Sequence, residues 1–110
     1  MQINARESNG VTILELAGEI DINTSPGVRR SFDQLIKEGK NKILLNFAQV
    51  TYIDSSGLAT LVEMLQRLKR LNGLMRLANL SEKVRGLFEI TKLDKIFSIF
   101  SNQEEALKDF

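Results

Sequence analysis

The first twenty residues have the hydrophobic pattern of a β-hairpin. Residues 11–18 are mostly apolar or β-branched and are typical of a strand. Residues 2–7 are expected to pair with them, because the Asn9-Gly10 step that follows is a strong signal for a tight turn. We therefore expect the chain to begin with two neighbouring strands of a sheet.

Helical spacing of apolar residues follows this hairpin. Thr24 or Ser25 can cap a helix at this point, and Pro26 suits the first helical position. The helix is predicted to end near Gly39. Its apolar stripe consists of Val28, Phe32, Leu35 and Ile36.

The middle of the chain predicts a buried strand and then a long amphipathic helix. Residues 42–47 are almost continuously apolar, as in a strand covered on both faces of a parallel sheet. Tyr52 is expected to anchor the entry of the helix from a short loop, and Met64 lies at the margin of the apolar stripe. That stripe, which ends before Asn72-Gly73, is Leu58, Leu61, Val62, Leu65 and Leu68. The opposite face is predicted to be solvated and carries Glu63, Gln66, Arg67, Lys69 and Arg70.

The last third predicts two strands, each followed by a helix. Residues 74–78 are typical of a strand, and Ser81 is placed to cap the helix after it. That helix has Val84, Leu87 and Phe88 on one side. Residues 95–100 predict a short last strand, and Ser101 with Glu104 has the spacing of a capping box for a terminal helix.

The predicted order of elements is β-β-α-β-α-β-α-β-α, with no internal repeat and no linker. Strands that alternate with amphipathic helices are typical of an α/β fold. We therefore expect one α/β domain over residues 1–110, in which a small mixed sheet of four to five strands packs with about four helices. The pattern leaves the order of the strands in the sheet open.

Composition narrows the classes of function. The 110 residues carry 15 basic and 14 acidic side chains, and a net charge of +1 is too balanced for a nucleic-acid binding surface. Cysteine and histidine are absent, which excludes thiol chemistry, disulfides and the commonest metal ligand. No signal peptide and no apolar run of membrane-spanning length are present. The expectation is a cytoplasmic protein without nucleic-acid or membrane partners.

Catalytic motifs are missing as well. A serine nucleophile needs a base, and the chain has neither histidine nor the Ser-x-x-Lys and Gly-x-Ser-x-Gly patterns. The glycine spacings of phosphate-binding loops do not occur. Glu19, Asp21 and Asp54 could hold a hard cation if they met in space, although solvated carboxylates at strand ends are the favoured interpretation. We expect a protein that is not an enzyme, with no metal and no cofactor.

Four unusual residues precede the long helix: Asp54, Ser55, Ser56 and Gly57. One side-chain oxygen is enough to cap a helix and contributes about 1 kcal/mol, yet three polar side chains crowd this start. Gly57 falls where the helix should already be running, a position at which glycine costs roughly 0.5–1 kcal/mol relative to alanine. Capping alone is the simple interpretation. The alternative is that a bare backbone here lets another surface approach closely.

Three longer segments carry a resemblance to a known family. They are LAGEIDINTS, KILLNFAQVTYIDSSGLATLV and LSEKVRGLFEITKLDKIF, in this order. Together they closely resemble the anti-sigma-factor antagonists, the stand-alone members of the STAS domain family, over residues 11–100. The Asp-Ser-Ser-Gly-Leu block is the most specific part, and the Gly-Glu-Ile-Asp element adds independent weight.

The resemblance implies a regulatory protein that works by partner switching. In this family the unphosphorylated antagonist binds an anti-sigma factor that is also a serine kinase, and a sigma factor is thereby released. Phosphorylation of the serine after the aspartate separates the two proteins, and a metal-dependent serine/threonine phosphatase reverses it. That serine corresponds to Ser55, with Ser56 as the alternative. The protein is expected to be a monomer or weak dimer, and its implied partner surface comprises Glu19, Asp21, Asn23, Thr24, Asp54, Ser56, Gly57 and Leu58.

Two other functions stay open at this point. The chain could be a STAS subunit of a different assembly, such as a stressosome or a lipid-transporting ABC system. It could also be a nucleotide-binding or small-molecule-binding module, because a helix start can hold a ligand phosphate.

Overall fold

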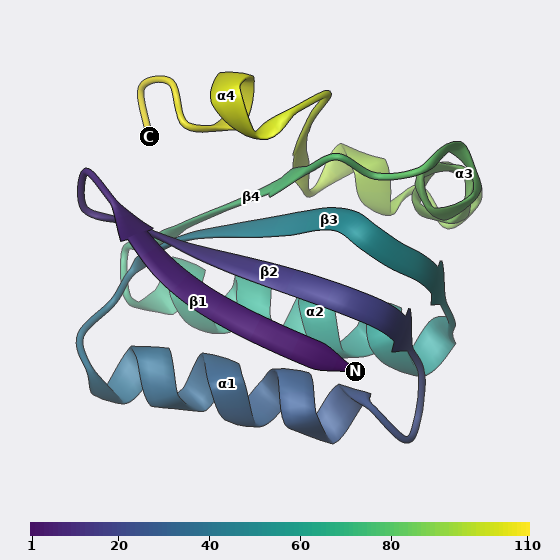
Figure 1. Ribbon diagram of the computed structural model, residues 1–110, viewed down its shortest axis with the longest axis horizontal. Helices are drawn as coiled ribbons and strands as arrows, with labels where there is room; N and C mark the ends of the chain where they lie inside the picture. Colours follow the sequence, from purple (N-terminus) through teal and green to yellow (C-terminus); the bar gives the residue numbers. More distant parts are fainter.

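The five strands lie side by side in the order in which they occur in the sequence, β1-β2-β3-β4-β5. The computed structural model describes residues 1–110 (Figure 1). The strands are β1 (Gln2–Ser8), β2 (Val11–Ile20), β3 (Lys42–Ile53), β4 (Leu74–Ala78) and β5 (Ser98–Phe100). The helices are α1 (Ser25–Lys37), α2 (Ser55–Arg70), α3 (Glu82–Ile90) and α4 (Gln103–Ala106), with a 3₁₀ turn at Leu93–Lys95. The predicted α/β domain and its order of elements are confirmed.

The sheet is mixed, because β1 and β2 are antiparallel and all other neighbouring strands run parallel. Asn9 and Gly10 form the turn of the hairpin and have positive φ values of 50° and 83°. A two-residue turn with this backbone matches the twist of the flanking strands, and asparagine and glycine adopt it at low cost. The hairpin prediction is therefore confirmed.

Helices α1 and α2 cover one face of the sheet (Figure 1). Each leads from one parallel strand to the next, the arrangement expected for a βαβ crossover. Their apolar stripes join the inward side chains of the strands in a cluster of 21 buried residues. Met64, expected at the margin of the stripe, is fully buried in this cluster. That expectation is corrected, because α2 packs against α1 and β4 and therefore buries a wider stripe than its leucines indicate.

β3 continues to Ile53, beyond residue 47 where the continuous apolar run ends. It pairs with β4 only over residues 42–46, so its second half projects past that strand. Two irregularities in the pairing with β2 disturb the alternation of side chains in this half. The buried residues of the projecting half are therefore spaced by three and not by two: Phe47, Val50 and Ile53. This spacing hid the rest of the strand from the sequence pattern.

Helix α3 packs beside the projecting half of β3. The ring of Phe88 contacts the rings of Phe47 and Phe97 edge to face, at centroid distances of 6.4 and 5.5 Å. Tyr52 lies in β3 and not in a loop, which corrects the prediction. Its side chain is 38% exposed, and the Lys83 Nζ of α3 lies 5.6 Å from the centre of its ring.

The C-terminal segment covers part of the opposite face of the sheet (Figure 1). Ala106 is buried there in a second apolar cluster that includes Leu44. Asn102 caps α4, because its Oδ1 accepts a hydrogen bond at 2.8 Å from the backbone N–H three residues later. The capping box predicted for Ser101 and Glu104 is therefore wrong by one position. None of the helices combines the length and apolar character that crossing a bilayer requires.

Arg76 of β4 holds this segment against the sheet. Its guanidinium lies over the rings of Phe100 and Phe110, at 5.1 and 4.6 Å from their centroids. The same group donates hydrogen bonds of 2.6 to 3.1 Å to three backbone carbonyls, those of Ala106, Lys108 and Asp109. One side chain thus satisfies three carbonyl groups near the end of the chain.

Replacing Arg76 by alanine is expected to loosen this segment. Hydrogen bonds from a charged donor are lost, so the free energy of unfolding should fall by about 1–3 kcal/mol. Urea denaturation measures this fall, and hydrogen exchange should become faster in residues 103–110 first. The matched control is Arg70→Ala, which removes an exposed arginine from α2. Unchanged exchange in the Arg76 variant would show that apolar packing alone holds the segment.

Candidate functional site

β2 and β3 end side by side, and α2 begins directly after β3 (Figure 1). Ile20 and Ile53 are paired at these ends, and the Asp54 N–H donates a hydrogen bond of 3.1 Å to the Ile20 carbonyl. The loop after β2 and the first turn of α2 therefore lie next to each other at the carboxyl edge of the parallel strands, where ligand sites of α/β sheets commonly form. We refer to residues 19–24 and 54–58 as the carboxyl-end surface.

Asp54 is the N-cap of α2. Its backbone is extended, and its Oδ1 accepts hydrogen bonds from the Ser56 hydroxyl at 2.6 Å and from the Gly57 N–H at 3.0 Å. The Ser56 hydroxyl and, next, the Gly57 N–H lower the pKa of Asp54 below the ordinary carboxyl range, because both donate to the ionised form. The capping interpretation is confirmed for this residue.

The two serines after Asp54 have different surroundings. Ser55 is exposed, and its hydroxyl makes no hydrogen bond within the protein. Ser56 is half-buried: its hydroxyl is bound to Asp54, and its carbonyl accepts a 3.0 Å hydrogen bond from the Thr60 hydroxyl. Only Ser55 presents a free hydroxyl to solvent or to another protein.

Gly57 is buried, and the surface that approaches it is the protein's own sheet. A Cβ at this position would lie 2.7 Å from Ile20 Cγ2, 2.8 Å from Ile53 Cγ1 and 2.9 Å from the Ile20 carbonyl oxygen. The expectation of an external close approach is therefore corrected: glycine lets α2 start directly against the ends of β2 and β3. Leu58 is 7% exposed and belongs to the core cluster, so it offers little surface to a partner.

The loop after β2 is held by its own polar groups. Asp21 Oδ1 accepts hydrogen bonds from the N–H groups of Asn23 and Thr24, at 2.9 and 3.1 Å. The Thr24 hydroxyl accepts from the Asp21 N–H at 2.9 Å and donates to the Glu19 carbonyl at 2.7 Å. Thr24 precedes α1 at the N-cap position but makes no side-chain capping bond, because its hydroxyl serves the loop. Ser25 is likewise turned to the loop and donates to the Asp21 carbonyl at 2.7 Å.

The acidic side chains of this surface do not form a metal site. Asp21 binds backbone amides of its own loop, and Asp54 binds the first turn of α2. No three acidic side chains of the chain gather closely enough to hold a metal ion. Glu19 is exposed at the end of β2, where it pairs with Tyr52 of β3. The carboxylates thus give this surface negative charge.

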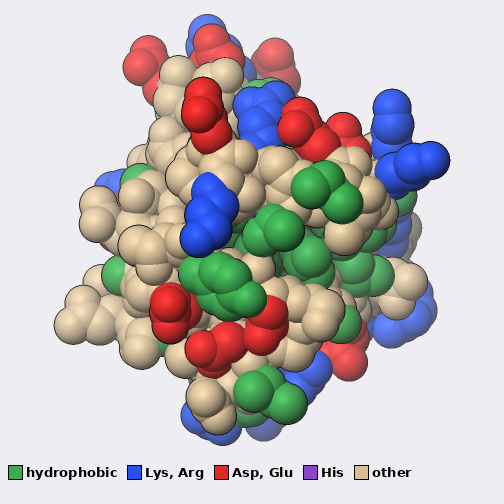
Figure 2. All heavy atoms as spheres, turned by 90° about the vertical axis from the view of Figure 1, so that its right-hand side faces the viewer, with side chains coloured by type: hydrophobic (Ala, Val, Ile, Leu, Met, Phe, Trp, Pro, Cys, Tyr) green, Lys and Arg blue, Asp and Glu red, His purple; other side chains and the backbone are tan.

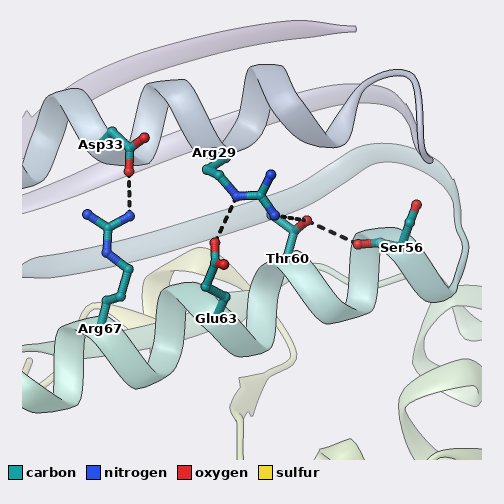
Figure 3. A network of polar contacts seen from close by, with 6 residues as sticks. All are labelled: Arg29, Asp33, Ser56, Thr60, Glu63 and Arg67. Atoms are coloured by element: carbon teal, nitrogen blue, oxygen red, sulfur yellow. Dashed lines mark hydrogen bonds and ion pairs between the residues drawn. The ribbon is translucent and has the colours of Figure 1, made fainter.

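A polar network connects the first three turns of α2 to α1 (Figure 3). Arg29 donates through Nε to Glu63 at 2.8 Å and through Nη2 to the Thr60 hydroxyl at 3.3 Å. Thr60 in turn donates to the carbonyl of Ser56, so the network reaches the turn that carries the serines. These contacts were missed at the level of sequence, because each residue alone has the pattern of a solvated polar position.

Arg67 was expected on a solvated face, and this is corrected. It pairs with Asp33 of α1 (Figure 3). Its guanidinium also lies 5.2 Å from the centre of the Phe32 ring. The reason is that α2 lies alongside α1, so part of its polar face meets the other helix. On α1 a basic residue, Arg29, is followed one turn later by an acidic one, Asp33. On α2 the order is reversed, with the acidic Glu63 one turn before the basic Arg67. That complementary spacing was a usable signal in the sequence.

Figure 2 views the molecule from the end at which β2 and β3 finish, and hydrophobic side chains gather in the middle of this face beside grouped acidic ones. Ile22 is 72% exposed in the loop after β2 and was missed as a site residue. A groove of about 370 Å³ lies between Ile22 and the first turns of α1 and α2, with Arg29 and Ser56 in its wall. Exposed apolar side chains within a polar rim are typical of a surface that binds another protein.

Comparisons with known sequences agree with this picture. The profile of the STAS domain family matches residues 2–106. An anti-sigma-B factor antagonist of Bacillus subtilis (strain 168) is 30% identical over 108 residues, which cover 98% of this chain and 98% of that protein. An anti-sigma F factor antagonist of Paenibacillus polymyxa is 30% identical over 110 residues, which cover 99% and 94%.

Solved structures show the same architecture. A crystal structure from Thermotoga maritima, provisionally named an anti-sigma factor antagonist, has a TM-score of 0.92 at 29% identity and covers 97% of this chain and 92% of its own. The Bacillus cell fate determinant SpoIIAA in its phosphorylated form has a TM-score of 0.73 at 23% identity, with 96% of each chain covered, and shows likeness of fold alone.

Together with the full-length relatives, the mixed sheet and the Asp-Ser-Ser-Gly start of α2 place the chain among small regulatory binding domains. The chain belongs to the STAS domain family. Its relatives along the full length are antagonists of anti-sigma factors, and the prediction that it is not an enzyme is confirmed by them.

Proposed function

We propose that this protein is an anti-sigma factor antagonist whose binding is switched off by phosphorylation of Ser55. The free, exposed Ser55 hydroxyl on the carboxyl-end surface is the observation that carries this proposal. Both full-length relatives bear the name of such antagonists, and the structural neighbour SpoIIAA has been solved in a phosphorylated form. Without the modification, the surface binds an anti-sigma factor, and a sigma factor is thereby released.

The fold can accept a phosphoryl group at Ser55 without rearrangement. Ser55 is the first residue of α2, where the N–H groups of the first turn and the helix dipole favour negative charge. The side chain is exposed, so the added bulk extends into solvent and not into the core. Helix content should therefore be unchanged by the modification.

The partner interface cannot accept it as easily. A phosphoryl group adds roughly −1.5 to −2 charges beside Asp54 and on the same surface as Glu19 and Asp21. Each pair of like unit charges at about 4 Å costs on the order of 1–4 kcal/mol between bulk water and near-surface conditions. A docked protein would have to accommodate this charge, so one modification weakens binding while the domain itself stays intact.

The anti-sigma factor is the proposed kinase, with a nucleoside triphosphate as donor. The bond from Ser55 Oγ to the γ-phosphorus forms as the bond from that phosphorus to the β–γ bridging oxygen breaks. The hydroxyl proton passes to a base of the kinase, and the nucleoside diphosphate leaves. A metal-dependent serine/threonine phosphatase restores the hydroxyl by hydrolysis. The protein acts in this cycle as a monomer or weak dimer in the cytoplasm.

Intact mass spectrometry tests the proposal. The protein is incubated with ATP and candidate anti-sigma factor kinases, and a gain of one phosphoryl group on Ser55 is the expected result. Ser55→Ala serves as the control and should gain none. A Ser55 that stays unmodified with every candidate kinase contradicts the proposal, as does nucleotide binding without a partner or a modification, which would indicate a ligand-binding module.

A further inference from the structure

Ser56 is held from two sides in the first turn of α2. Its hydroxyl donates a 2.6 Å hydrogen bond to Asp54 Oδ1, the oxygen that also caps the helix through the Gly57 N–H. Its carbonyl accepts a 3.0 Å hydrogen bond from Thr60. Asp54 in turn is tied to β2 through the bond from its N–H to the Ile20 carbonyl. Ser56 is therefore part of the connection between the sheet and the helix.

The second tie of Ser56 leads to α1 (Figure 3). Thr60 is 2% exposed and receives a hydrogen bond from Arg29, which is itself fixed by Glu63. The chain of contacts runs from α1 through Thr60 and Ser56 to Asp54 at the cap. Ser55 takes no part in this chain: it is exposed, and its hydroxyl makes no hydrogen bond within the protein. The neighbouring hydroxyls thus differ in kind, one bound inside the protein and one free.

We propose that Ser56 is a positioning residue, whose hydroxyl bond to Asp54 fixes the first turn of α2 so that Ser55 alone is offered for modification. The kinase step of this inference rests on the function proposed above. The Ser56 hydroxyl is half-buried and its proton is directed at Asp54 of the same protein, so a base of the kinase can take that proton only after this bond is broken. Ser56 is therefore a poor acceptor, and the same bond holds the backbone that presents Ser55.

The inference predicts a signature that does not need a kinase. The hydrogen-bond donors to the Asp54 carboxylate are the Ser56 hydroxyl and backbone N–H groups, among which that of Gly57 contributes most. The other acidic groups of this surface are Glu19 at the end of β2 and Asp21 in the loop after it. Removal of the hydroxyl in Ser56→Ala should raise the Asp54 pKa toward its ordinary value. Ser56→Thr keeps a hydroxyl and should restore the low pKa, and Ser55→Ala should leave it unchanged.

Carbon-13 NMR titration of the Asp54 carboxyl measures these pKa values in the full chain. Because folding lowers the Asp54 pKa, the ionised carboxylate stabilises the fold at pH values above the pKa of the unfolded chain, which is about 4. This stabilisation is lost as the pH falls through the lower pKa of the folded protein. The stability difference between wild type and Ser56→Ala should therefore be full at pH 7 and shrink below about pH 4. An Asp54 pKa that does not move in Ser56→Ala, or that moves equally in Ser55→Ala, overturns the inference.

Phosphorylation of the same variants separates this inference from the proposed function. Ser56→Ala should still gain one phosphoryl group, on Ser55, at a rate lowered about five-fold, the effect of one ordinary hydrogen bond. Ser56→Thr should recover the rate. Modification of Ser56 in Ser55→Ala overturns the positioning role of Ser56, although phosphorylation at the start of α2 would still regulate binding. If wild type itself is never modified, the proposed function fails, and the titration still decides the role of Ser56.

Discussion

Replacing Ser55 by aspartate is expected to weaken binding to the anti-sigma factor while the fold remains intact. The carboxylate places a permanent negative charge beside Asp54, on a surface that already carries Glu19 and Asp21. At about 1–4 kcal/mol for each like-charge contact, the dissociation constant should rise by a factor between about five and nearly a thousand. Isothermal titration calorimetry against the purified anti-sigma factor measures the change.

Two controls accompany this variant. Circular dichroism should show the helix signal of wild type, because an acidic residue is favourable in the first turn of a helix. Ser101→Asp adds the same charge at an exposed position before α4, away from the carboxyl-end surface, and should not change the affinity. A loss of helix signal in Ser55→Asp would instead show that this serine serves only the start of α2.

Replacing Gly57 by alanine is expected to destabilise the protein by about 1–3 kcal/mol, the usual cost of forcing extra volume into a packed interior. The added Cβ would lie within 2.9 Å of two side-chain carbons and the Ile20 carbonyl oxygen. These atoms belong to the packed core and to the backbone of β2, so they cannot easily move to make room. The start of α2 must then move away from the ends of β2 and β3. Urea denaturation gives the change in the free energy of unfolding.

Gly86→Ala is the matched control for this substitution. Gly86 also lies within a helix, α3, but a Cβ there meets nothing within 4 Å. Alanine is the better helix former by roughly 0.5–1 kcal/mol, so this variant should be as stable as wild type or more so. If Gly57→Ala proves equally harmless, then the contact between α2 and the sheet is not tight, and the packing reason for this glycine is wrong.

Local signals in the sequence were enough to predict the elements of the fold. The Asn9-Gly10 turn, the apolar run of β3 and the leucine stripe of α2 each reflect a short-range preference that the structure keeps. The second half of β3 was missed because two pairing irregularities change the spacing of its buried residues from two to three. Such an irregularity depends on the neighbouring strand, and no pattern within β3 alone contains it.

The residues of the candidate site were predictable from the sequence, but the role of each residue was not. The sequence places Asp54, Ser55, Ser56 and Gly57 together at a helix start, as the structure does. Which serine is bound and which is free depends on side-chain direction, and the reason for the glycine depends on Ile20, far away in the chain. Arg29 was missed although its charge spacing with Asp33 complements that of Glu63 and Arg67, and Ile22 was missed because the exposure of a loop side chain appears only once the elements are packed.

The position of the first residue has a practical consequence for experiments on this protein. Met1 lies against Gly18 of β2 and shares a shallow hollow with Asn23 and Thr24, whereas the last residue lies toward the other end of the molecule (Figure 1). A fluorophore, affinity handle or chip linker attached to the amino group would lie close to the proposed partner surface. Attachment beyond Phe110 leaves that region open, so surface-plasmon and fluorescence measurements should immobilise or label the carboxyl end.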